Sequence, residues 1–152
     1  MSTEQPSTEK PRLVGMNHVA LEVGSIDEAL AFWGAIFEFE LRGRSDTAAF
    51  IDMGDQFIAL MKADKSERDD PRHFGLVVDD RSRVRDLARA AGAHVPEGRF
   101  VDIYDPWGNM IQIIDYKDIQ FSKTEGVLRG MGLSDLAKTE AARQELADKN
   151  ML

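Results

Sequence analysis

The chain has 152 residues, of which 43% are hydrophobic and 30% are charged, a balance typical of one globular domain with a buried core. The formal net charge of −8 argues against nucleic acid as a partner. No apolar run approaches the roughly 20 residues of a membrane-spanning helix, and the N-terminal residues lack an apolar signal core. A chain without cysteine has no disulfide, zinc–thiolate site or cysteine nucleophile. We therefore expect a cytoplasmic protein with no nucleic-acid or membrane partner.

The first part of the chain predicts a tail followed by a folded unit. Residues 1–11 are polar and contain two prolines, which is typical of a flexible tail. In NHVALEV (17–23), alternate side chains share a face, so His18 and Glu22 lie opposite the apolar residues. Apolar residues then recur at helical spacing from Ala29 to Ile36. Three strands are expected after this helix, at about 38–44, 47–53 and 56–62.

The same pattern occurs a second time. A shift of 55 residues (73 − 18) places RHFGLVV (72–78) over NHVALEV and His73 over His18. The next helix matches as well, and strands are expected at about 93–95, 99–104 and 109–116. The sequence therefore predicts an α+β domain over 12–117, with two tandem β-α-β-β-β units at about 13–62 and 72–116 that form a cupped mixed sheet. The helix-free side of this sheet would carry His18, Ala59, His73 and Gln112 at equivalent places.

The closing stretch DPWGNMIQIIDY (105–116) combines a turn with a strand. Ile111 and Ile113 point to one side of that strand, and Gln112 points to the other. Both sides look buried. An amide in such a place must be hydrogen-bonded or bind something, because leaving it unsatisfied costs roughly 1–3 kcal/mol.

These features resemble the vicinal oxygen chelate superfamily, the group of glyoxalases, bleomycin-resistance proteins and extradiol dioxygenases. The resemblance rests on the His18 strand, its repeat at His73 and the closing DPWGNMIQIID, which is similar to the family's Asp-Pro-x-Gly-Asn-x-x-Glu pattern. It covers about residues 13–116. It implies the glyoxalase-like fold, but one such fold carries many reactions.

The resemblance also implies a set of metal ligands. Metal-binding members use up to four equivalent strand positions, which correspond here to His18, Ala59, His73 and Gln112. Ala59 has no donor atom, and Gln112 stands where a glutamate is usual. We expect His18, His73 and Gln112 to hold a divalent metal such as Zn, Ni, Mn or Fe, more weakly than a carboxylate site would. The alternative is a metal-free group in which the three side chains bond one another, a water or a ligand.

Three further residues are candidates for the pocket. Glu22 shares a face with His18 and is interpreted as a general base or as a solvated residue at the rim. Tyr104 and Trp107 flank the closing turn and are predicted to wall the substrate pocket, although aromatic residues there also serve as core or dimer contacts.

Residues 118–152 form an extension beyond the repeat. Ser134 is a candidate N-cap for a helix over 134–150 whose apolar residues are sparse. Such a helix needs a surface to dock on, and we expect it to pack on a dimer partner or to cover the cavity.

Two functions from different classes follow, with a third kept open. The first is a metal-dependent lyase, isomerase or dioxygenase that acts on a small oxygenated substrate in a homodimer. The alternative is a metal-free protein that binds a small molecule or an antibiotic, as in the bleomycin-resistance branch. The third is an interaction module that works through its C-terminal extension.

Overall fold

The computed structural model describes residues 10–152, so nearly all of the predicted tail lies outside the described residues. The first unit contains β1 (His18–Val23), α1 (Ile26–Ile36), β2 (Glu40–Arg44), β3 (Ala48–Asp52) and β4 (Phe57–Lys62). Its strands form the first sheet, in the order β1-β4-β3-β2, with β1 parallel to β4. These elements lie close to the predicted ranges.

The second unit repeats this arrangement with one strand fewer. It contains β5 (Phe74–Val78), a 3-10 turn (Arg81–Arg83), α2 (Val84–Ala90), β6 (Val101–Tyr104) and β7 (Met110–Asp115). The second sheet has the order β5-β7-β6, with β5 parallel to β7. The strand expected at 93–95 is reduced to a single bridge between His94 and Tyr104. Pro96 follows directly and has no N–H to extend the ladder. The predicted α+β class and the repeat of the unit are confirmed.

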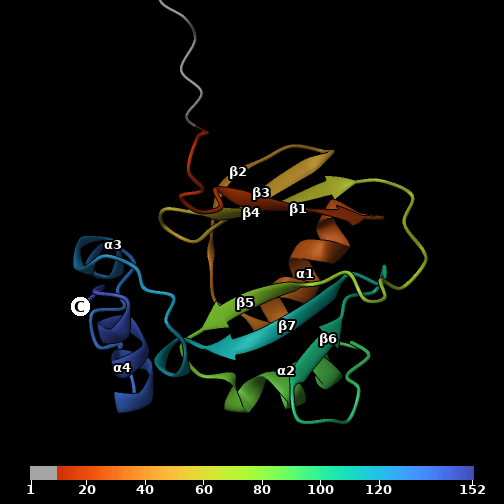
Figure 1. Ribbon diagram of the computed structural model, residues 1–152. Coiled ribbons are helices and arrows are strands. Elements are labelled where there is room, and N and C mark those ends of the chain that lie inside the picture. Colours follow the sequence, from red (N-terminus) through yellow and green to blue (C-terminus); the bar gives the residue numbers. More distant parts are fainter. Residues whose placement is uncertain (1–9) are drawn as a thin grey trace, which may run out of the picture.

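Helix α1 lies between the two sheets (Figure 1). It begins at Ser25, whose hydroxyl accepts a hydrogen bond from the Glu28 N–H at 3.2 Å, and Asp27 and Glu28 suit the positive end of its dipole. Trp33 and Ile36 point into the core and are 1% and 7% exposed. This apolar stripe is what the helical spacing from Ala29 to Ile36 predicts.

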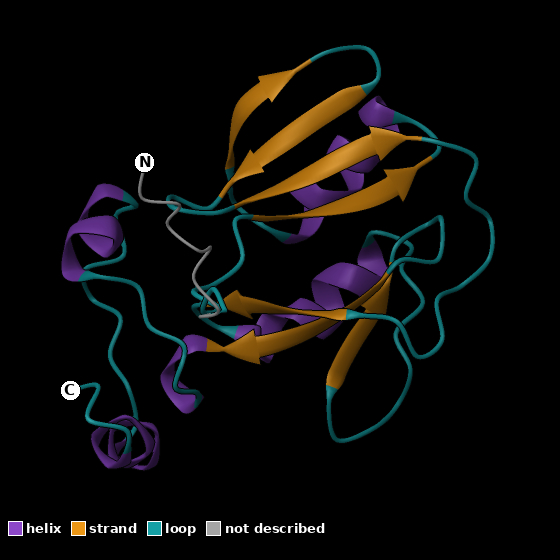
Figure 2. Ribbon diagram, turned by 45° about the horizontal axis from the view of Figure 1, so that its top comes forward, coloured by secondary structure: helices purple, strands orange, loops and turns teal. Residues whose placement is uncertain are grey.

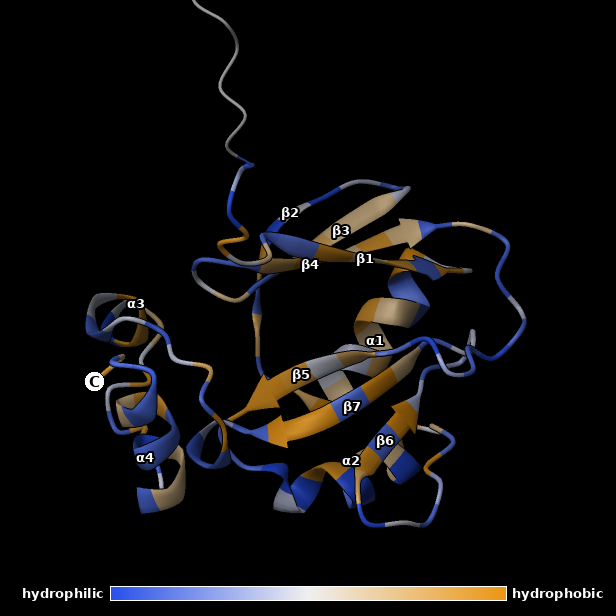
Figure 3. Cartoon of the chain, viewed as in Figure 1, coloured by the Kyte–Doolittle hydropathy of each residue, from blue (hydrophilic) through white to orange (hydrophobic). Residues whose placement is uncertain are grey.

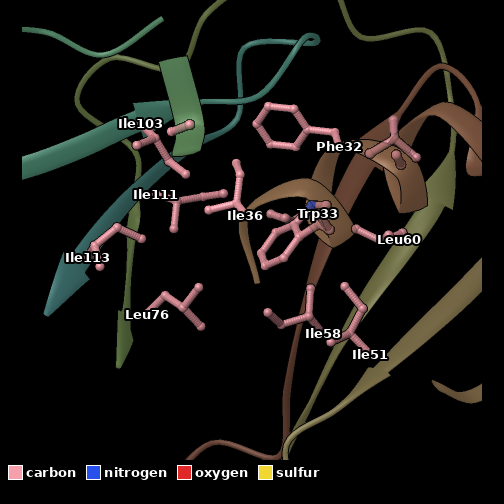
Figure 4. Close-up of a cluster of buried hydrophobic side chains, with 14 of the residues drawn as sticks. Phe32, Trp33, Ile36, Ile51, Ile58, Leu60, Leu76, Ile103, Ile111 and Ile113 are labelled. Atoms are coloured by element: carbon pink, nitrogen blue, oxygen red, sulfur yellow. The ribbon is translucent and has the colours of Figure 1, made fainter. Parts of the chain in front are cut away.

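Both sheets share one hydrophobic core. Figure 4 shows side chains from the first sheet and from the second sheet meeting around Trp33 and Ile36. The buried residues from the sheets include Ile51, Ile58, Leu60, Leu76, Ile103, Ile111 and Ile113. Because side chains alternate along a strand, the remaining residues of each sheet point away from this core. We call that helix-free side of each sheet its outer face.

The closing turn joins the two units at one end of the molecule. The Asn109 side-chain N–H donates to the carbonyl of Glu22 at 2.8 Å, so the start of β7 lies beside the end of β1. The Trp107 ring packs against Gly24, where a Cβ would collide with the indole. Strands β1 and β4 run opposite to β5 and β7, as the arrows in Figure 2 show.

The C-terminal extension contains α3 (Glu125–Gly130) and α4 (Glu140–Asp148). The helix predicted from Ser134 begins later, because Thr139 provides the cap by accepting from the Ala142 N–H at 3.3 Å. The extension does dock: Lys123 donates to the Met53 carbonyl and pairs with Asp55 in the turn between β3 and β4. Within residues 10–152, no helix is both long enough and apolar enough to span a bilayer.

Candidate functional site

His18 lies on the outer face of the first sheet, in an aromatic setting. Its ring stacks on Phe57, the residue paired with it on β4, with centroids 4.7 Å apart and planes 9° apart. Its Nδ1 lies 2.8 Å from the side-chain oxygen of Asn17. An amide oxygen only accepts, so a hydrogen bond here uses the Nδ1–H tautomer, in which Nε2 is the ring nitrogen left for a ligand. The guanidinium of Arg42 lies 4.4 Å from the centre of the Phe57 ring.

His73 on the second unit also has an oxygen atom 2.8 Å from its Nδ1. It directly precedes β5 and is exposed. Its Nδ1 lies 2.8 Å from the carbonyl oxygen of Pro71, which can only accept, so Nε2 again carries the free lone pair. A histidine that ligates a metal usually donates its other N–H to an oxygen acceptor in this way. The alternation along β5 places His73 on the same side as Gly75.

Gln112 lies in the middle of β7 on the outer face of the second sheet. It is half-buried, between the core residues Ile111 and Ile113, which are 0% and 1% exposed. Figure 3 shows that β5 and β7 are hydrophobic along most of their length, so Gln112 is a polar residue among hydrophobic neighbours on β7. Within residues 10–152, no hydrogen bond involves its side chain. Its neighbours across the sheet are Gly75 on β5 and Asp102 on β6.

One copy of the chain does not bring these three candidates together. His73 precedes β5 near the end of β1, whereas His18 begins β1, and roughly 13 Å of strand separates His18 from Glu22. His18 and Gln112 lie on outer faces that both turn away from the shared core. Among residues 10–152, no three histidine, aspartate or glutamate side chains gather as a metal site. One copy of the chain therefore does not form a site from His18, His73 and Gln112.

Asp102 is a candidate that the sequence analysis missed. Val101 and Ile103 face the core, so Asp102 points to the outer face, directly opposite Gln112. Its Oδ1 atom is buried and has no hydrogen-bond partner among residues 10–152. The alternation of VDIY contained this signal, but only the pairing of β6 with β7 places the carboxylate beside Gln112.

Ala59 and Glu22 occupy the first sheet with His18. Ala59 is 4% exposed and lies in the middle of β4, and its side chain offers no donor atom. Glu22 is exposed on the outer face at the far end of β1 from His18.

The two predicted pocket aromatics lie in different places. Tyr104 is on the outer face of the second sheet, where its hydroxyl lies 3.3 Å from the Met110 sulfur and the Arg68 guanidinium lies 5.4 Å from its ring centre. Trp107 packs between the two units against Gly24 and belongs to their junction.

The closing turn contains a network of buried hydrogen bonds that positions β7. Asp105 is 4% exposed and accepts from the N–H groups of Trp107 and Asn109, at 3.0 and 2.8 Å, and from the Asn109 amide at 2.7 Å. Burial raises the pKa of the Asp105 carboxyl, while these hydrogen bonds act in the opposite direction. The motif thus sets the register of the strand that carries Gln112.

A cavity of about 510 Å³ opens beside His18. It is lined by the starts of β1 and β4, by β5, and by Phe121, Lys123 and Leu128 of the extension. A larger space of about 1150 Å³ lies between the units and α3, away from both outer faces. The extension therefore forms one wall of the cavity next to His18.

Comparisons with known proteins agree with this architecture. A family model described as Glyoxalase/Bleomycin resistance protein/Dioxygenase superfamily matches residues 15–113. No curated protein sequence matches the chain.

Solved structures show a similar fold. The fosfomycin resistance protein FosX from Mesorhizobium loti is 21% identical, with a TM-score of 0.59 over 67% of this chain and 91% of that one. The genomically encoded FosX from Listeria monocytogenes, complexed with Mn(II) and sulfate ion, is 20% identical, with a TM-score of 0.58 over 67% and 92%. An integron cassette protein from V. cholerae is 16% identical, with a TM-score of 0.55 over 71% and 99%.

Proposed function

Because the chain belongs to the Glyoxalase/Bleomycin resistance protein/Dioxygenase superfamily, we propose that it is a divalent-metal-dependent enzyme that acts on a small oxygenated substrate. The observation that carries the proposal is the matched state of His18 and His73. In each ring, an oxygen acceptor 2.8 Å from Nδ1 leaves the Nε2 lone pair free. An oxygen partner on the second ring nitrogen is the usual arrangement of a histidine that ligates a metal.

The residues of the candidate site fit a divalent cation. His18 and His73 offer imidazole nitrogens, Gln112 offers a carbonyl oxygen, and the unpartnered oxygen of Asp102 lies beside it. A divalent metal held by these residues would supply Lewis-acid chemistry toward a carbonyl or enediolate oxygen of the substrate. The chain's own part is to hold the ligands in place and to surround the substrate with apolar walls such as Phe57 and Tyr104.

The site is completed by a second copy of the chain. The outer faces carry His18 on one sheet and Gln112 on the other, and they point away from each other in one copy. Both faces also carry partly exposed apolar residues, including Met61, which is 41% exposed. Apolar sheet faces of this kind favour a partner surface. In a homodimer, the first sheet of one copy facing the second sheet of the other brings the ligands together.

An anionic substrate suits this site. Arg42 and Arg68 lie over aromatic rings on the two outer faces, and neither has a carboxylate partner among residues 10–152. A guanidinium binds carboxylate or phosphonate oxygens through two parallel N–H groups. Substrates with an acidic group beside the reacting oxygen are therefore expected to bind best.

The first test is elemental analysis of the untagged protein, purified without chelator, beside the His18→Ala variant. We expect roughly one metal per chain in the wild type and a loss in the variant. Turnover of 2-oxoaldehydes, epimerisable thioesters and catechols would then be screened. If reconstitution with Zn, Ni, Mn and Fe(II) leaves the protein metal-free, the proposal is wrong.

The alternative function is a metal-free small-molecule binder. Ala59 favours it, because this position, equivalent to a metal ligand in metal-binding members, has no donor atom. A binder would show thermal stabilisation by aromatic or antibiotic ligands with chelator present. His18→Ala would then weaken ligand binding without any change in metal content.

A further inference from the structure

Asp102 and Gln112 form a pair of oxygen donors on the second sheet. Strand β6 is antiparallel to β7, and the two residues are directly opposite in the register. The Cβ atoms of such a pair are about 4.5–5.5 Å apart and point to the same side. That side is the outer face, because the neighbours Val101, Ile103, Ile111 and Ile113 are all buried in the core.

One oxygen of the Asp102 carboxylate has no hydrogen-bond partner among residues 10–152, although the residue as a whole is partly exposed. Its Oδ1 atom is buried without a hydrogen bond, and within residues 10–152 no lysine, arginine or histidine lies within ion-pair distance of it. Burying an uncompensated carboxylate oxygen is costly. Asp105, on the same segment, shows the contrast, because three N–H groups satisfy its oxygens. The Oδ1 atom of Asp102 therefore has an oxygen lone pair available to a partner from outside the chain.

We propose that Asp102 supplies the carboxylate ligand that Gln112 cannot supply, so that the two hold a divalent cation together with the histidines. This inference rests on the proposed metal-dependent function. Two neutral imidazoles and a neutral amide leave the full positive charge of the cation in place, and one carboxylate offsets part of it. Oxygen donors of this kind suit Mn²⁺ and similar hard cations. The carboxylate would then come from β6, one strand away from Gln112 on β7.

The test measures Mn²⁺ affinity by calorimetry on the chelator-treated full-length chain. Asp102→Asn keeps the shape of the side chain and removes its charge. We expect its dissociation constant to rise at least about tenfold, as loss of weaker outer partners already does. Asp46→Asn is the matched control, because this exposed loop aspartate loses the same charge and should leave the affinity unchanged.

A rescue variant separates ligation from general damage. The double variant Asp102→Asn/Gln112→Glu removes the carboxylate from β6 and places one on the neighbouring strand β7. We expect its Mn²⁺ affinity to be within a few-fold of that of the wild type. Thermal unfolding without Mn²⁺ checks that each variant is folded, and Asp102→Ala provides a second removal of the ligand.

The outcomes distinguish the two proposals. If the wild type binds Mn²⁺ and Asp102→Asn and Asp102→Ala bind it equally well, Asp102 is no ligand, while the metal-dependent function stands. If the wild type itself binds no divalent cation, both proposals are overturned. Weak binding in Asp102→Asn that the Gln112→Glu change does not restore also contradicts ligation by Asp102.

Discussion

In the closing turn, a single glycine allows close packing against the segment that links the two units. Gly108 is buried, has a φ of +88°, and lies against the backbone of Glu67 and Arg68. A Cβ there would be 2.6 Å from the Glu67 carbonyl oxygen and from the Arg68 Cα, and backbone atoms cannot move aside as a flexible side chain can. The glycine is therefore needed both for its conformation and for the close approach.

We expect Gly108→Ala to lower the free energy of unfolding by about 2–4 kcal/mol, from left-handed strain together with overpacking. Gly34→Ala is the matched control, because Gly34 lies in α1 with nothing within 4 Å of the added Cβ. That change should stabilise the helix by about 0.5–1 kcal/mol. Chemical denaturation measures both, and equal effects of the two substitutions would contradict this account.

Among the elements, the C-terminal extension depends on one ammonium group. Lys138 donates to the carbonyls of Tyr116, Ile119 and Phe121 at 2.7, 2.7 and 2.6 Å. The same ammonium lies 3.6 Å from the centre of the Tyr116 ring. Partial burial lowers the pKa of Lys138. This contact fixes the path from the end of β7 into α3 and α4, and so the wall of the cavity beside His18.

We expect Lys138→Met to release the extension, because three carbonyls lose their donor at a cost of about 1–3 kcal/mol. Amide hydrogen exchange should accelerate in α3 and α4 and stay unchanged in the two sheets. Lys149→Met removes only a pair with Glu145 at 3.4 Å on an exposed surface and should have little effect. Uniform acceleration throughout the protein in Lys138→Met would mean that the extension is part of the global folding unit.

For the whole molecule, the decisive feature is that the two outer faces point away from one another. The inner residues of both sheets bury themselves against α1, which leaves His18 and Gln112 on opposite sides of the chain. If two copies share the site, a chain that lacks one ligand can be complemented by a chain that lacks another ligand. A site formed within one chain cannot be restored in this way.

We expect mixed dimers of His18→Ala and His73→Ala chains to regain metal binding at one of their two sites. One site then receives both histidines and the other receives neither. Each variant alone should bind little Mn²⁺, because both of its sites lack a ligand. Differently tagged, co-expressed chains allow the mixed dimer to be isolated, with His18→Ala chains carrying both tags as the control. A mixed dimer that binds no better than either parent contradicts a site shared between copies.

The sequence by itself determined the elements and the repeat, because alternation, helical spacing and turn residues act over a few neighbouring positions. It placed His18 and Gln112 on their strands, and His73 lies next to its strand, directly before β5. The strand expected at 93–95 was wrong, because Pro96 stops its pairing after a single bridge. The helix start expected at Ser134 was also wrong, because Thr139 caps the helix instead. Only the tertiary structure decided that both sheets share one core around α1 and that Asp102 lies beside Gln112. Those facts depend on contacts between residues far apart in the chain, which no local pattern records.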